Sequence, residues 1–272
     1  MRAAAAKSGL RFYGIKEVEE LFLPLIGFVK AGFPSPADNF LESDIDLVAF
    51  FGMNKPYMRI VRVEGDFLVD NHAPDGSLLI VDTLLKPITN DLVIVALNGD
   101  YLVRTIVKAL NGWMLYSENT ICNPTIIGEE DNFKVLGVVV QVILSTRHRA
   151  RSKAGTISFE ESIDLPTLLN MYKPSVYVVR TDGNSMEGEH LTDKSYLIVD
   201  RSLKPEPHDI AVAVLNGDFT VKKLIHSPKG WVLYAANNHY SPIPVKENDD
   251  FTVWGVVAHI VIDRKEMRKN CG

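Results

Sequence analysis

The chain has 272 residues, of which 46% are hydrophobic and 23% charged, and its formal net charge is −5 at pH 7. This length is typical of about two globular domains. The negative net charge argues against a protein that binds nucleic acid through overall electrostatic attraction. The longest apolar run, residues 135–144, is too short to span a bilayer, so we expect no membrane association. The two cysteines, Cys122 and Cys271, stand far apart, which favours a reducing cytoplasm and no disulfide or metal site.

The chain begins with a lead segment that carries few strand signals. Residues 15–22 are predicted to form a short helical turn that stops before Pro24, because proline cannot continue a helix. Glycine and several prolines then interrupt residues 29–40. These residue types favour polyproline or edge-strand geometry, so we expect this stretch to be extended.

After the lead segment the sequence repeats itself. Shifted by 118 positions, the chain matches itself without a gap over about 95 residues. A period of this length indicates tandem domains, since the repeats of solenoids are roughly 20–50 residues long. Each copy contains six β-rich runs: 57–63, 77–81, 92–97, 101–107, 113–116 and 133–144 in the first, and 176–180, 196–199, 210–215, 219–224, 231–234 and 251–262 in the second.

The runs are joined by turns, and helix is predicted only in short pieces such as 166–169. Asn-Gly at 98–99 and at 216–217 predicts two tight hairpins, because both residue types tolerate positive φ. Each copy is therefore expected to be mainly β, with short antiparallel strands. The long apolar last strands would aggregate as bare edges, so we expect them to pair the copies about a pseudo-two-fold axis. The expected parts are a lead segment (1–31), a first domain (32–145), a linker (146–154) and a second domain (155–272).

The second copy carries a candidate catalytic pair. Gly-Asn at 183–184 predicts a tight turn that presents the Ser185 hydroxyl together with the N–H groups of Ser185 and Met186, which suit an oxyanion hole. Lys222 and Lys223 are adjacent on a predicted strand, so their side chains face opposite sides. One can therefore be buried while the other is exposed to solvent. A buried lysine has a lowered pKa and is a competent general base for a serine. Residue type alone leaves open that Ser185 is a turn serine and Lys222 an exposed strand lysine.

The first copy lacks this pair. Phe67 and Arg104 occupy the positions that align with Ser185 and Lys222. Phenylalanine has no nucleophilic atom, and arginine does not lose its proton at a useful pH. The first copy is therefore predicted to be a degenerate domain that keeps the scaffold without the chemistry.

Spaced segments of the second copy resemble the self-cleaving LexA-type serine peptidases, most closely the UmuD-like ones. They are Gly-Asn-Ser-Met at 183–186, Leu-Ile-Val-Asp at 197–200, Gly-Asp-Phe-Thr-Val-Lys-Lys-Leu at 217–224, and residues 237–243, which are similar to the family's N-x-x-Y-x-P-I segment. The resemblance implies that Ser185 is the nucleophile and Lys222 the general base. It also implies that the chain is an enzyme, a serine peptidase that cuts itself.

The family cuts an Ala-Gly or Cys-Gly bond on its N-terminal side, and residues 29–36 resemble that site around Ala31 and Gly32. A second candidate, Ala154–Gly155, lacks the preceding valine and the following prolines. Because the first copy has no catalytic pair, the second copy is expected to cut Ala31–Gly32, within one chain or between two.

The resemblance implies a role in the SOS response of bacteria. Self-cleavage would be prompted by the RecA filament on single-stranded DNA, and the product would be an accessory subunit of a UmuC-type translesion polymerase, with the sliding clamp as a further partner. No cofactor is expected. Alternatives are a non-cleaving scaffold for the polymerase or RecA, a signal-peptidase-like enzyme, and a LexA-type transcriptional regulator. The 31 residues before Gly32 are too few for a helix-turn-helix domain, so direct sequence-specific DNA binding is not expected.

Overall fold

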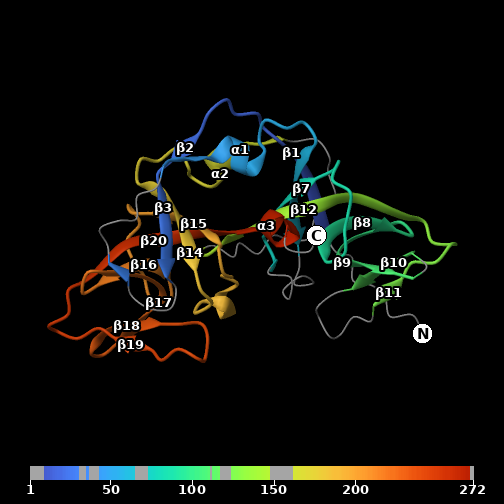
Figure 1. Ribbon diagram of the computed structural model, residues 1–272. Helices are drawn as coiled ribbons and strands as arrows, with labels where there is room; N and C mark the ends of the chain where they lie inside the picture. The colour runs from blue at the N-terminus through green and yellow to red at the C-terminus, as the bar shows by residue number, and fades with distance from the viewer. Residues whose placement is uncertain are drawn as a thin grey trace.

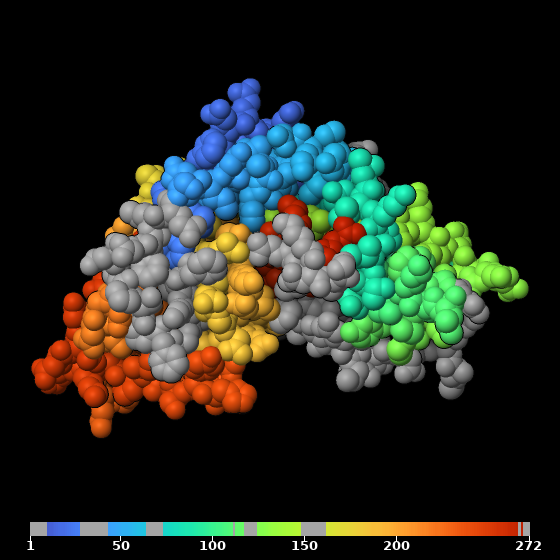
Figure 2. Space-filling model, in the orientation of Figure 1, coloured from blue at the N-terminus to red at the C-terminus, as the bar shows by residue number. Residues whose placement is uncertain are grey.

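The computed structural model describes residues 9–30, 35–36, 43–64, 73–110, 112–116, 124–147 and 162–269. Strands dominate, and two similar β-rich halves stand side by side, with the second copy on the left of Figure 1 and the first on the right. Figure 2 shows the blue and light-blue part of the chain lying across the top of both halves. No helix in the described ranges is long and apolar enough to cross a membrane.

The two copies have the same strand order. In the first copy the order is β6 (Met58–Glu64), β7 (Leu78–Asp82), β12 (Phe133–Ser145), β8 (Asp91–Leu97), β9 (Asp100–Ala109), β10 (Gly112–Tyr116) and β11 (Thr125–Ile126). In the second it is β14 (Val176–Asp182), β15 (Tyr196–Asp200), β20 (Phe251–Asp263), β16 (Ile210–Leu215), β17 (Asp218–Ser227), β18 (Gly230–Tyr234) and β19 (Ile243–Pro244). All these pairs are antiparallel, which confirms the predicted mainly β fold.

All six runs predicted in each copy are strands, with ends shifted by a few residues at most. The two Asn-Gly hairpins are also confirmed. Asn98 and Gly99 have φ values of 52° and 90°, and Asn216 and Gly217 have values of 53° and 87°. Positive φ at both central residues gives a turn whose twist matches that of paired strands.

The helices are short: α1 (Leu47–Phe51), α2 (Leu165–Leu168), the 3-10 helix η3 (Glu187–Glu189) and α3 (Arg264–Lys269). The predicted helical piece at 166–169 is confirmed as α2. The aligned residues Asp46 and Asp164 cap α1 and α2, because their carboxylates accept hydrogen bonds from the N–H groups of Ala49 and Thr167.

A glycine in each long strand permits a change of register. Near Gly137 the pairing partner of β12 changes from β8 to β7, and near Gly255 the pairing partner of β20 changes from β16 to β15. A Cβ on Gly137 would stand 2.5 Å from Cγ1 of Val81, and one on Gly255 would stand 2.6 Å from Cγ1 of Val199. Both glycines therefore allow neighbouring strands to approach more closely than a residue with a side chain would.

Replacing Gly137 by alanine should destabilise the fold by about 1–3 kcal/mol, because the added methyl group overpacks the core. Gly128→Ala is the matched control, since its Cβ would meet only Oδ2 of Asp131 at 3.5 Å. Thermal unfolding followed by circular dichroism measures both. Equal midpoints for the two variants would show that the close approach costs nothing.

The last strands join the two copies. Strands β12 and β20 pair antiparallel through Gln141↔Asp263, Val142↔Ile262, Ile143↔Val261, Leu144↔Ile260 and Ser145↔His259. Ile143 and Val261 are aligned residues of the two copies, so the ladder is symmetric about this pair. One buried apolar cluster contains side chains of both copies, such as Leu79 and Leu197. The predicted pseudo-two-fold pair, with its long terminal strands in contact, is confirmed.

The lead segment pairs with strands of both copies. It forms β1 (Gly9–Ile15), β2 (Phe22–Leu23) and β3 (Leu25–Lys30), and β4 (Ser35–Pro36) follows it. The short strands β13 (Ser162–Ile163) and β5 (Ile45–Asp46) pair with β1 and β2. Strand β1 runs antiparallel to β6 of the first copy, whereas β3 runs parallel to β14 of the second. In Figure 1 the blue β3 lies among the yellow and orange strands.

The helical turn predicted for residues 15–22 is wrong. Ile15 ends strand β1, and the chain enters β2 at Phe22. Leu21 and Leu23 are buried while Phe22 is exposed, which is the two-residue period of a strand. Burial of these leucines against the core decides the conformation over local preference. The extended geometry expected from residue 29 onward is confirmed at the end of β3 and in β4.

Candidate active site

Ser185 stands in a turn that follows β14. Gly183 has a φ of 97°, and its N–H donates a 2.8 Å hydrogen bond to the carboxylate of Asp193. Positive φ is easy for glycine because it has no Cβ. After this sharp turn, Ser185 is fully buried, and Met186 leads into η3.

The turn is held by a segment about fifty residues later. The side-chain amide of Asn237 donates to the carbonyl oxygen of Asn184 at 3.0 Å, and the hydroxyl of Tyr240 donates to Oδ1 of Asn184 at 2.9 Å. The N–H of Gly188 donates to the carbonyl of Ala236 at 2.8 Å. Segment 237–243 thus positions the residue before the serine, a role that the sequence alone does not reveal.

Lys222 lies inside the protein, opposite Ser185. Its side chain is 1% exposed, and Nζ lies 3.1 Å from Oγ of Ser185, 3.1 Å from Oγ1 of Thr220 and 3.0 Å from the carbonyl oxygen of Val221. Burial lowers the pKa of Lys222 from its usual 10.5 to about 8. Desolvation disfavours the charged amine, so a substantial fraction is neutral just above neutral pH.

The neighbouring lysine points the other way. Nζ of Lys223 lies 2.5 Å from a carboxylate oxygen of Glu189, at a partly exposed position. The alternation expected on this strand, with one lysine buried and one wet, is confirmed. The same alternation places Thr220 beside Lys222, so the Thr-Val-Lys spacing could have revealed this contact, which the sequence analysis missed.

Strands β3 and β4, which precede and follow the Ala31–Gly32 bond, pair with strands next to Ser185 and Lys222. Strand β3 pairs with β14 as far as Lys30↔Asp182, three residues before Ser185. Strand β4 pairs with β17 through Ser35↔Phe219, three residues before Lys222. Ala31 and Gly32 lie between β3 and β4, outside the described residues, as do Ala154 and Gly155 of the second candidate bond.

The first copy places an arginine in the position of the lysine. Nη1 of Arg104 donates to the carbonyl oxygen of Val103 at 2.7 Å, as Nζ of Lys222 does to that of Val221. A guanidinium stays protonated at pH values where proteins fold, so it cannot take a proton from a hydroxyl. Phe67 lies outside the described residues.

No group of three or more metal-binding side chains occurs within the part of the chain that the structure describes. The chemistry that the site can perform is that of a buried serine hydroxyl beside a partly neutral amine. Such a pair supports nucleophilic attack on a carbonyl, with the amine as general base.

Comparison with known proteins identifies the family of the chain. The sequence matches the family described as Peptidase S24-like twice, over residues 24–140 and over residues 146–258. The chain belongs to this family. It is a tandem protein of the UmuD-like, LexA-type serine peptidases, with one Peptidase S24-like domain in each copy.

Curated relatives match about the length of one Peptidase S24-like domain. Protein MucA of Salmonella typhimurium is 30% identical over 105 residues, which are 38% of this chain and 71% of MucA. Protein SamA of Salmonella typhimurium is 32% identical over 117 residues, which are 43% of this chain and 81% of SamA. The LexA repressor of Syntrophotalea carbinolica is 30% identical over 116 residues, which are 40% of this chain and 57% of the repressor.

Proposed function

We propose that the chain cuts itself once, between Ala31 and Gly32, with Ser185 as nucleophile and Lys222 as general base. The observation that carries the proposal is the 3.1 Å contact between Nζ of Lys222 and Oγ of Ser185 at two buried side chains. The strands on either side of residues 31–34 lie against β14 and β17, which supports delivery of this segment within one chain.

The proposed reaction has two steps. The neutral amine of Lys222 takes the proton of Oγ as Oγ attacks the carbonyl carbon of Ala31, and the N–H groups of Ser185 and Met186 stabilise the oxyanion. The ammonium then gives its proton to the leaving nitrogen of Gly32, which becomes a new amino terminus. Water, deprotonated by Lys222, hydrolyses the ester between Ala31 and Ser185 and restores the hydroxyl.

The division of labour between the copies follows from this chemistry. The second copy supplies the proposed dyad, while the first copy has Arg104 in place of the lysine and follows directly after the proposed cleavage segment. The first copy is then the partner whose leading strand is cut. The proposed parts are the lead segment 1–31, domains 32–145 and 155–272, and the linker 146–154.

The names of the relatives support a role in the SOS response and its mutagenesis. We propose that the cut chain acts as an accessory subunit of a UmuC-type translesion polymerase. The RecA filament on single-stranded DNA would prompt the cut, and the sliding clamp would be a further partner. The protein would work in the bacterial cytoplasm. Pull-down of the polymerase by the cut and uncut chains tests the proposed role as an accessory subunit. A non-cleaving scaffold would bind equally before and after incubation at alkaline pH.

Self-cleavage should accelerate between pH 7 and pH 9. With the pKa of Lys222 at about 8, the neutral fraction of the amine rises from about one-tenth at pH 7 to about nine-tenths at pH 9. The first-order rate, measured by denaturing gel, should therefore rise about tenfold and level off above pH 9. A rate that falls or stays flat over this range would contradict a lysine base.

Tyr240→Phe should slow cleavage about tenfold without changing the thermal midpoint appreciably. The variant loses only the hydroxyl that holds Oδ1 of Asn184, and loosening the serine turn misplaces the nucleophile. Tyr234→Phe is the matched control, since Tyr234 is an exposed tyrosine on β18. Equal cleavage rates for the two variants would show that the Tyr240 hydroxyl does not position Ser185.

A further inference from the structure

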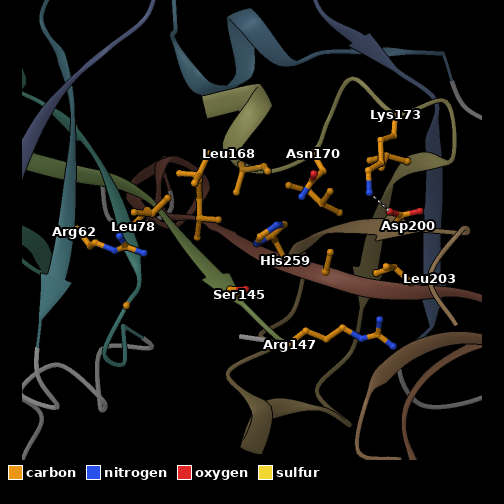
Figure 3. A pocket seen from close by; sticks show the side chains of 16 residues that line it. Arg62, Leu78, Ser145, Arg147, Leu168, Asn170, Lys173, Asp200, Leu203 and His259 are labelled. Atoms are coloured by element: carbon orange, nitrogen blue, oxygen red, sulfur yellow. Dashed lines mark hydrogen bonds and ion pairs between the residues drawn. The ribbon is translucent and has the colours of Figure 1, made fainter. Parts of the chain in front are cut away.

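A cavity of about 360 Å³ lies between the two copies, away from Ser185 and Lys222. The first copy contributes side chains of β6, β7 and β12, and the second contributes side chains of α2, β14, β15 and β20 (Figure 3). Leu168 of α2 lines the cavity and is 44% exposed, so the cavity reaches solvent there. Small-molecule sites often have this size and lie at domain interfaces.

The lining combines an apolar surface with several polar and charged side chains. Leu78, Ile143, Leu169, Val176 and Ile198 contribute hydrocarbon surface. Burial lowers the pKa of His259, which stands in the middle of the cavity in Figure 3, to about 4. The imidazole is then neutral at pH 7 and adds no charge to the cavity.

Of the three cations that line the cavity, Arg62 differs from the other two within the described part of the chain. Arg147 pairs with Asp209, and Lys173 pairs with Asp200 at 3.3 Å. Among the described residues, Arg62 forms no ion pair, and its Nε is buried without a hydrogen-bond partner. Figure 3 shows its guanidinium extending from β6 into the cavity beside Leu78. A buried donor left unpaired is costly, and an acceptor on a ligand would satisfy it.

The pseudo-two-fold axis relates this cavity to an equivalent position on the other side of the axis. Aromatic side chains occupy that position. Leu78 and Leu168 align with Tyr196 and Phe50, whose rings pack with centroids 4.8 Å apart. Arg62 aligns with Arg180, whose guanidinium lies over the ring of Tyr196 at 5.5 Å. Two leucines in place of two aromatic residues therefore leave one of the two equivalent places open.

We propose that this cavity binds one small molecule that has an apolar body and a carboxylate, with the carboxylate held by the guanidinium of Arg62. Arginine is suited to carboxylates because its planar donors bind both oxygens. The bound molecule contacts both copies and stabilises their packing. This site goes beyond the proposed peptidase function and does not depend on self-cleavage.

Titration calorimetry of the full chain with octanoate and with 1-octanol tests the proposal. Octanoate should bind with one site per chain and raise the thermal midpoint, whereas 1-octanol, which has no charge, should bind about tenfold more weakly or worse. Arg62→Met should weaken octanoate binding about tenfold or more, and Arg180→Met, its matched control, should leave binding unchanged. No octanoate binding to the parent chain, or equal binding of octanoate and 1-octanol, would overturn the proposal.

A second variant fills the cavity with the residues of its counterpart. Leu78→Tyr combined with Leu168→Phe should abolish octanoate binding, while the thermal midpoint stays near that of the parent. Unchanged binding in this folded double variant would place octanoate elsewhere and overturn the assignment. If the double variant does not fold, the comparison of Arg62→Met with Arg180→Met decides alone.

Discussion

Ser185→Ala and Lys222→Ala should each reduce self-cleavage at least about a thousandfold, and the double variant should be no slower than either single one. The serine and lysine act as a unit, so removing either removes the nucleophilic route. Both side chains are buried and 3.1 Å apart. The measurement is the fraction of chain cut at pH 9 as a function of time, read from denaturing gels.

Two matched controls accompany this result. Arg104→Ala alters the aligned position of the degenerate copy, and Lys223→Ala alters the adjacent lysine that faces Glu189. Both should cut within about threefold of the parent rate, because neither residue touches the hydroxyl of Ser185. If Arg104→Ala lost cleavage as completely as Lys222→Ala with an unchanged thermal midpoint, the first copy would belong to the catalytic centre.

The cut lead piece, residues 1–31, should stay bound to the rest of the protein. Strand β1 pairs with β6 at six positions and β3 pairs with β14 at four. Leu10, Leu21, Leu23 and Ile26 are all buried, and burying such a side chain contributes about 1.5–3 kcal/mol. Cutting one bond removes none of these contacts, so severing the chain and losing the lead piece are separate events.

Gel filtration of the cut protein in native buffer, followed by denaturing mass spectrometry, measures this retention. The lead piece should elute with the large fragment in the parent. It should separate from the large fragment in a Leu10→Asp variant, which places a charge in the core, whereas Glu19→Ala alters an exposed side chain and should retain the piece. Free lead piece from the parent would mean that these strands hold it too weakly to outlast the cut.

Much of the fold follows from local patterns. The β-rich composition of the six runs in each copy and the Asn-Gly pairs at 98–99 and 216–217 depend on neighbouring residues only, so the sequence predicts them. The partner of an extended lead segment depends on distant residues. The pairing of β3 with the second copy and the strand character of Leu21 and Leu23 could not be predicted for this reason.

The candidate site divides in the same way. Ser185 and Lys222 stand in sequence motifs and could be identified from them. The alternation of side chains along β17 explains why Lys222 is buried while Lys223 is partly exposed. The contacts of Asn237 and Tyr240 with Asn184 join residues more than fifty positions apart, and spacing alone gives no sign of them. The cavity at Arg62 was also hidden, because it exists only after the two copies pack together.

Intact-mass spectrometry after incubation at pH 9 tests the central claim most directly, with the parent and Ser185→Ala run side by side. The account predicts two products from the parent, residues 1–31 and 32–272, and a single uncut mass from the variant. Products ending at Ala154 and beginning at Gly155, or an equally cut Ser185→Ala chain, would contradict it.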